Sequence, residues 1–203
     1  MGPGIGSVEA VQLVTAEGEI IEASADQNQE YYWAARGAGP AMFAVATQYK
    51  LKLYPLPKNI VSSVYYYPYE DMAQVCDWLG PIARKLPSNL ELSMAVLNAP
   101  PELADKCASS NGKIGMVVAA LFADSPDEIN AALSPLDTCP IIDKCLSKSV
   151  AQPTDFDGLF DASGAMWPPG LRCQADALFY KSSLTEIFKT VKDTLLKQHL
   201  HKL

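Results

Sequence analysis

The sequence predicts an α+β protein in which a small β-rich part precedes a mainly antiparallel sheet with helices on one face. Runs that alternate between apolar and polar residues are interleaved with runs of helical spacing, and the apolar run Ile114–Ala123 is typical of a central strand. The two prolines of Tyr54–Lys58 favour extended backbone and resist both helix and central strand. We therefore expect two domains, residues 1–57 and 58–203.

The first part of the chain is expected to form a β-hairpin, a short helix and a third strand. Val8–Thr15 and Glu19–Ser24 are rich in strand-forming residues and flank a turn that contains a glycine. Polar residues that can cap a helix precede Gln29–Ala35. Val45–Tyr54 alternates well enough to be a strand.

The second part is expected to supply the larger sheet and most of the helices. Pro81 lies inside one helical run, where a proline kinks or breaks the helix. Strands are expected over Ile60–Tyr67, Leu90–Leu97, Ile114–Ala123, Cys145–Val150 and Leu171–Tyr180. Helical segments are expected over Tyr69–Ala83, Leu103–Cys107, Ser125–Leu136, Phe156–Phe160 and Leu184–Leu196.

Composition excludes several classes of protein. The chain has 203 residues, of which 49% are hydrophobic, so it can bury a sizeable core. Its net charge of −7 leaves no cluster of cations to neutralise phosphates, and we expect no nucleic-acid partner. No run approaches the roughly 18 apolar residues that a membrane helix needs. Residues 1–4 do not open a signal peptide, so we expect a soluble protein, cytoplasmic by default.

Cysteine and histidine usage limits the available chemistry. The five cysteines show no C-x-x-C spacing, so we expect reduced thiols, no disulfide framework and no metal site. Cys139 and Cys145 could bridge in an oxidising compartment, and the sequence leaves their state open. The two histidines, His199 and His201, lie in the last five residues. Ser-His-Asp and Cys-His catalysis are therefore not expected in the body of the chain.

The connection between the short helix and the third strand, residues 33–47, carries the strongest functional pattern. Gly37 and Gly39 can take positive φ and let a ligand approach the backbone, while Pro40 fixes φ and lacks a donor. Such a loop is either a tight connection or a cradle for a bound group. The tight connection is the commoner structure for an isolated G-x-G, so the choice depends on the surrounding sequence.

That surrounding sequence, Ile5–Pro57, resembles the closing portion of the PCMH-type FAD-binding domain in FAD-linked oxidases of the vanillyl-alcohol-oxidase and berberine-bridge-enzyme type. The resemblance is carried by the hairpin within Val8–Ser24, by a W-A-x-R-G turn after the helix, and by Gly39–Thr47, where the family usually has G-G-N-F-G-V-V-T. The chain departs from that pattern at Pro40, Ala41, Met42 and Ala44. The resemblance implies FAD as cofactor, with contacts from Gly37, Ala38, Gly39, Pro40, Ala41, Phe43, Ala44 and Val45.

The same resemblance implies that residues 1–57 are the C-terminal part of an FAD-binding domain and that residues 58–203 form a substrate-binding domain. The family's Gly-rich pyrophosphate loop is not among these residues, so we expect an incomplete copy that is not active alone. Its parent would be an oxidase that moves a hydride from a small organic substrate to flavin. The alternative is a flavin-free binding or oligomerisation module, in which a homo-oligomer covers the surface left by the missing FAD subdomain.

Four side chains are candidates for the substrate pocket, and no catalytic base is identified. Alternation places Tyr65 and Tyr67 on one face of a strand and Tyr66 on the other. Tyrosine also favours half-buried strands without any ligand, and this packing role accounts for at least one of them. Arg172 and Tyr180 share a face of one expected strand, where they could bind a carboxylate or a phenolate.

Overall fold

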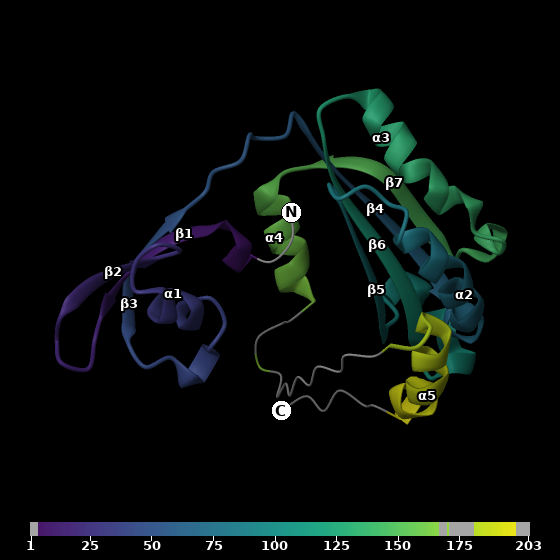
Figure 1. Ribbon diagram of the computed structural model, residues 1–203. Helices are drawn as coiled ribbons and strands as arrows, with labels where there is room; N and C mark the ends of the chain where they lie inside the picture. Colours follow the sequence, from purple (N-terminus) through teal and green to yellow (C-terminus); the bar gives the residue numbers. More distant parts are fainter. Residues whose placement is uncertain (1–3, 167–169, 171–180, 198–203) are drawn as a thin grey trace. The chain divides into compact units, whose positions relative to one another are not determined.

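The computed structural model describes residues 4–166, 170 and 181–197, and the chain divides into two compact units, Met1–Leu56 and Pro57–Leu203 (Figure 1). Each unit has its own antiparallel sheet and its own buried apolar cluster. The predicted α+β fold class is therefore confirmed. Among the described residues, no helix combines the length and the apolar character that crossing a bilayer requires.

The first unit is a three-stranded sheet with one helix. β1 (Val8–Val14) is the central strand and pairs with β2 (Ile20–Ser24) and β3 (Val45–Leu51), in the order β2-β1-β3. The helix α1 (Gln29–Ala35) connects β2 to β3. Short 3₁₀ turns occupy Gly4–Ser7 and Gly39–Ala41. β3 ends three residues before the predicted Tyr54, and beyond it the Lys52 N–H donates to the Ser7 carbonyl at 2.7 Å.

Two side chains hold α1 against the start of the chain. The Tyr32 hydroxyl donates to the Val8 carbonyl at 2.6 Å. Arg36 Nε donates to the Ile5 carbonyl at 3.2 Å, and the Arg36 guanidinium carbon lies 4.7 Å from the centre of the Tyr32 ring. Ala34, on the same helix, is buried, and these contacts together hold α1 against the residues at the start of β1.

The second unit contains a four-stranded antiparallel sheet in the order β5-β6-β4-β7. Its strands are β4 (Asn59–Pro68), β5 (Leu90–Asn98), β6 (Lys113–Ala123) and β7 (Ser147–Thr154). The predicted central strand corresponds to β6, which pairs with β5 on one side and β4 on the other. β7 begins two residues after the predicted Cys145 and continues to Thr154.

Helices α2 (Met72–Ala83), α3 (Pro126–Leu133) and α5 (Leu184–Lys197) cover one face of this sheet, as predicted, while α4 (Phe156–Ala165) lies on the other side (Figure 1). Pro81 lies in the last turn of α2, which continues for two more residues, so it does not break the helix.

The 3₁₀ segments of the second unit are η3 (Tyr69–Asp71), η4 (Pro101–Ser110), η5 (Ser134–Thr138) and η6 (Ile142–Lys144). The predicted strand over residues 171–180 lies outside the described residues.

The core of the second unit lies between the sheet and α2, α3 and α5. Alternate residues of β4, including Val61, Tyr65 and Tyr67, point into it and are 5%, 1% and 1% exposed. They meet apolar residues of α2 such as Val75, which is completely buried. This burial fixes which face of each strand looks toward the helices.

The helix α5 is fastened to α2 and η3 by both polar and aromatic contacts. The Tyr69 hydroxyl donates to the Lys192 carbonyl, and the Thr185 hydroxyl donates to the Asp77 carboxylate. The rings of Tyr69 and Phe188 meet edge to face, with their centres 5.6 Å apart. These contacts join segments that are more than a hundred residues apart in the chain.

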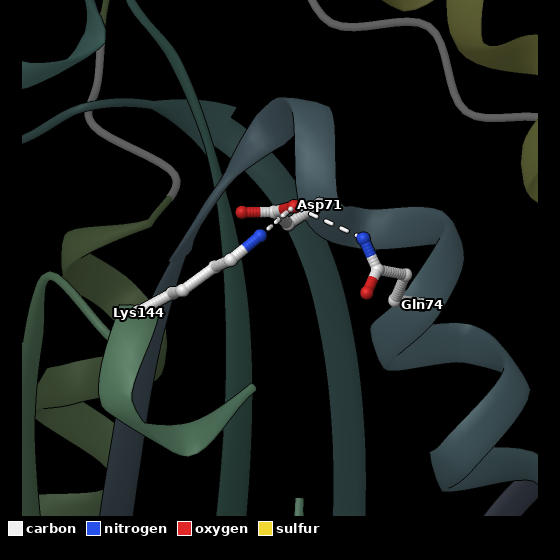
Figure 2. A network of polar contacts seen from close by, with 3 residues as sticks. All are labelled: Asp71, Gln74 and Lys144. Carbon is white, nitrogen blue, oxygen red and sulfur yellow. Dashed lines mark hydrogen bonds and ion pairs between the residues drawn. The ribbon is translucent and has the colours of Figure 1, made fainter. Parts of the chain in front are cut away.

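An ion pair ties the segment before β7 to the start of α2. Lys144 Nζ lies 3.0 Å from Asp71 Oδ1, and Gln74 Nε2 donates to the same oxygen at 3.1 Å (Figure 2). The Lys144 side chain is half exposed, so the pair contributes at most about 1 kcal/mol. It joins the end of η6, which lies two residues before β7, to the residue that precedes α2.

Met72 packs directly on the backbone of Gly115. A substitution at Gly115 therefore tests how tightly the core is packed. A Cβ at Gly115 would overlap the Met72 sulfur and lie 2.6 and 2.8 Å from its Cγ and Cε. Met72 is completely buried, so its side chain has no room to swing away. We expect Gly115→Ala to lower the free energy of unfolding by about 1–3 kcal/mol, as overpacking does. Urea unfolding followed by circular dichroism measures the loss.

The matched control is Gly80→Ala in α2, since a Cβ there meets nothing within 4 Å. This variant should be as stable as the parent or slightly more stable, because alanine favours helix over glycine. Adding Met72→Val to Gly115→Ala shortens the overlapping side chain and should recover part of the loss. Equal stability of Gly115→Ala and the parent would contradict the packing described for Met72.

Candidate functional site

The connection from α1 to β3 is an exposed turn that contains seven of the eight residues predicted to contact the cofactor, and the eighth, Val45, is the first residue of β3. Gly37 and Ala38 close the end of α1, since their N–H groups donate to the Ala34 carbonyl at 3.2 and 2.8 Å. Gly39 then takes a φ of 52°, a left-handed conformation that glycine adopts without strain. Each of the eight is exposed or half-exposed; they are Gly37, Ala38, Gly39, Pro40, Ala41, Phe43, Ala44 and Val45.

Backbone donors in this turn are free to meet a ligand. Within residues 4–166, 170 and 181–197, the N–H groups of Gly39, Phe43 and Ala44 have no hydrogen-bond partner. A Cβ built at Gly37 or Gly39 would meet nothing within 4 Å, so the space beside both glycines is open. Free N–H groups next to open glycine backbone can bind phosphate oxygens.

Aromatic rings stand beside the turn. The Phe43 ring lies 4.9 Å from the Tyr31 ring, centre to centre, at an angle of 57°. Phe43 is 54% exposed and Trp33, on α1, is 78% exposed. The turn therefore offers both polar backbone donors and apolar ring surface.

The second candidate surface is the face of the larger sheet that points away from α2, α3 and α5, which we call the open face. Its two middle rows run across the strands. One contains Ser93, Val118, Val64 and Ser149, and the other contains Glu91, Ala120, Ser62 and Gln152. All eight are exposed or half-exposed, and Glu91 is the one charged residue among them.

Larger side chains border these middle rows at both ends. At one end, Phe122 of β6 stacks on Phe156 of α4, with ring centres 5.9 Å apart and an interplanar angle of 25°. At the other end, Tyr66 packs against the cluster formed by Leu103 and Cys107 of η4 and Ile114 of β6. The open face is thus a floor of small side chains between two aromatic borders.

The structure places Tyr65 and Tyr67 on the opposite side, in the core. Their hydroxyls find no hydrogen-bond partner among the described residues. Burial, with a smaller contribution from Asp137, raises the pKa of Tyr65 to about 12. Burial, followed by contact with the Cys139 thiol, also raises the pKa of Tyr67. This position gives both phenols a packing role, and their contact with a substrate stays a prediction.

Other predicted features divide into those that the structure describes and those that it does not. Arg172 and Tyr180 lie outside the described residues, so their place in a pocket stays a prediction. Cys139 and Cys145 are both free thiols. The Cys145 thiol lies 3.2 Å from the Tyr66 carbonyl and 3.0 Å from the Ser147 carbonyl. Within the described part of the chain, no three His, Cys, Asp or Glu side chains gather to hold a metal ion.

Sequence reasoning missed the open face. Its signal is the set of residues that alternates with the buried ones: Ser62 and Val64 lie between Val61 and Tyr65 in β4, and Val118 and Ala120 flank Ala119 in β6. The tyrosines of β4 give the stronger sequence signal, whereas the exposed set consists mainly of small residues. Which of the two sets is exposed depends on where the helices pack, and strand periodicity alone does not say this.

No protein-family model matches the chain. Among curated proteins, it is 29% identical over 177 residues to the FAD-linked oxidoreductase janO of Penicillium janthinellum, covering 84% of this chain and 36% of that protein. It is 27% identical over 183 residues to the FAD-linked oxidoreductase nodO of Hypoxylon pulicicidum, covering 87% and 38%. The chain therefore spans little more than a third of the length of these relatives.

Solved structures show the same fold. The chain matches 6-hydroxy-D-nicotine oxidase from Arthrobacter nicotinovorans with a TM-score of 0.61 and 19% sequence identity, over 81% of this chain and 34% of that one. Together with the curated relatives, this match confirms the predicted resemblance to FAD-linked oxidoreductases.

The burial of Tyr65 predicts a pH dependence of stability. The phenol ionises near pH 10 in the unfolded chain but only near pH 12 in the folded one, so the unfolded state binds fewer protons in between. The stability that the neutral phenol contributes is complete below pH 10 and is lost as the pH rises through 12.

We expect Tyr65→Phe to be within about 1 kcal/mol of the parent at neutral pH, because the removed hydroxyl has no partner among the described residues. Between pH 10 and 12, its free energy of unfolding should fall less steeply than that of the parent. Denaturant titrations at a series of pH values measure both. A variant with the same slope as the parent would show that the Tyr65 phenol is accessible to solvent.

Proposed function

We propose that this chain, a relative of FAD-linked oxidoreductases over about a third of their length, is the segment of such an enzyme that supplies one wall of the flavin site and the floor of the substrate site. The observation that carries the proposal is the exposed α1–β3 turn, with Gly39 left-handed and three backbone N–H groups free among the described residues. Residues 1–57 are assigned to the FAD-binding domain and residues 58–203 to the substrate domain.

The turn fits part of an FAD molecule. Its free N–H groups, Gly39, Phe43 and Ala44, can donate to the oxygens of the nucleotide, and the absence of side chains at Gly37 and Gly39 lets the backbone approach it. Ala41 is exposed and Ala44 is partly exposed, so their methyl groups need not block the approach. FAD, when bound, supplies the acceptor for a hydride taken from the substrate.

The open face fits a small, largely uncharged substrate. The middle rows offer Val64, Val118 and Ala120 as apolar contacts and the hydroxyls of Ser62 and Ser93 as hydrogen-bonding groups. Glu91 stands on β5, which is an outer strand among those that the structure describes. A charged substrate would lose water on this floor without gaining an opposite charge near its centre, which costs free energy. These residues would bind and orient the substrate, and none of them is a proton acceptor of suitable chemistry at the centre.

A second candidate function is a flavin-free module that associates through its surface. The first unit favours this function, because large apolar side chains stand exposed on it: Leu53 at 89%, Trp33 at 78%, Ile20 at 71% and Val45 at 67%. Exposed apolar surface of this kind is typically covered by another protein surface. Homo-oligomerisation through the first unit is the corresponding form, and light scattering during gel filtration measures it.

Titration with FAD tests the leading proposal. We expect FAD to quench tryptophan fluorescence in the parent chain, since Trp33 is exposed on α1 beside the turn. Gly37→Val should weaken binding without unfolding the unit, because the valine side chain enters open space that the flavin nucleotide would otherwise occupy. Gly39→Val should weaken binding further, since the left-handed backbone costs a branched residue about 1–2 kcal/mol.

Gly18→Val is the matched control, because Gly18 has a φ of 81° and open surroundings but lies in the hairpin between β1 and β2. It measures the cost of strain alone and should leave the FAD response of the folded fraction unchanged. A parent chain whose fluorescence does not respond to FAD would reject flavin binding by this chain. Equal affinity of the parent and Gly37→Val would reject the turn as the contact.

A further inference from the structure

The turn between η4 and β6 consists of the one Asn-Gly pair in the sequence, Asn111-Gly112. Asn111 has a φ of 55° and a ψ of 38°, and Gly112 has a φ of 72°. Asparagine tolerates this left-handed conformation, and the glycine after it has no side chain to shield its backbone nitrogen. Asparagine is also among the residues least stable to chemical change.

Asn111 makes a contact that spans the second unit. Its Nδ2 donates to the Leu196 carbonyl at 3.1 Å, in the last turn of α5. The last carbonyls of a helix have no partner within the helix, so this bond satisfies one that would otherwise be unpaired. The other polar anchors of α5 lie nearer its start and middle, at Thr185 and Lys192. Asn111 therefore holds the C-terminal turn of the helix.

The same contacts restrain the reactive atoms of Asn111 and Gly112. The Gly112 N–H donates to the Cys107 carbonyl at 2.9 Å, which holds its proton and fixes its direction. The Asn111 carboxamide is held by the Leu196 carbonyl. Attack of the Gly112 nitrogen on the side chain requires both bonds to open. Fraying of the last turn of α5 releases the carboxamide.

We propose that Asn111 is a site of spontaneous deamidation, that its rate is set by opening of the last turn of α5, and that its acidic products cannot restore that turn. The Gly112 nitrogen loses its proton and bonds to Asn111 Cγ. The Cγ–Nδ2 bond then breaks, ammonia leaves, and a cyclic imide remains. Water opens the imide at either carbonyl to give aspartate or isoaspartate, with no change of oxidation state.

The acidic products lack the N–H group that Asn111 donates to the Leu196 carbonyl. A carboxylate has no N–H to donate, and the Leu196 carbonyl can only accept, so two acceptors face each other. Repulsion between them frees the last turn of α5. The modification thus converts a helix end that opens at times into one that stays open.

Peptide mapping by mass spectrometry of the intact chain after storage at mildly alkaline pH tests the site. Asn28 is the internal control, because it has the same left-handed backbone, with a φ of 48°, and its Nδ2 likewise donates to a carbonyl, that of Glu22 at 2.7 Å, but Gln29 follows it. We expect acid to accumulate several-fold faster at Asn111 than at Asn28 or the other four asparagines. Equal rates would overturn the assignment.

Control of the deamidation rate by opening of α5 is tested with Tyr69→Phe. This change removes the hydroxyl that donates to the Lys192 carbonyl and so loosens α5. We expect deamidation to be slower in the folded parent than in urea, and faster in Tyr69→Phe than in the parent. Identical rates in the three samples would reject gating by α5. Hydrogen exchange of β6 amides shows whether Tyr69→Phe loosens α5 alone or the whole unit.

The release of the last turn of α5 by the acidic product is tested with Asn111→Asp, which reproduces the aspartate product. We expect amides in the last turns of α5 to exchange several-fold faster than in the parent, while β4 and β6 amides keep their protection. Asn111→Gln keeps an amide but cannot form the five-membered imide, so it should stay unmodified on storage. Unchanged exchange in α5 of Asn111→Asp would overturn the claim that the product releases the helix.

Discussion

The burial of one face of the β4–β6 pair under α2 is the constraint on which the second unit depends. Met72 is completely buried against the backbone of Gly115, and Tyr65 and Tyr67 fill the space beside it. Because strand side chains alternate, each residue held inward fixes its neighbours outward. A shift of one residue in the register of β4 would bring Val64 and Tyr66 into the core and expose Tyr65 and Tyr67. The composition of the open face is therefore set by the packing behind it.

Periodicity was enough to predict the strands of this sheet but not the face that the helices cover. The apolar run from Ile114 gives the central strand, since both faces of β6 carry apolar residues. By contrast, β7 extends past the predicted Val150 through a bulge, in which Ala151 takes a φ of 50° and donates its N–H to the Ser63 hydroxyl at 3.0 Å. Among the described strands, β7 is also at an edge of the sheet, where Pro153 is tolerated. Neither the bulge nor the edge position is visible in a local pattern.

The glycines and the proline predict the turn after α1, but the two glycines adopt different backbone conformations. Gly37 keeps an ordinary φ because its N–H, like that of Ala38, closes the helix on Ala34. Gly39 alone takes the left-handed backbone, and the chain there turns away from the helix. The local sequence indicates that either glycine can take a positive φ. The hydrogen bonds at the end of α1 determine that Gly39, and not Gly37, does so. The free donors then follow from the irregular backbone between Gly39 and Val45.

The first unit has a small core, and this links its folding to anything that binds the turn. Its buried apolar cluster consists of Val8, Val11, Leu13 and Ala23, and small units bury a low fraction of their surface. The turn keeps its shape only while α1 stays docked through Tyr32 and Arg36. A ligand that binds the folded turn and not the unfolded chain adds its binding free energy to the stability of the unit. Binding at the turn and folding of the first unit are therefore linked equilibria, and a ligand of the turn would raise the stability of the unit.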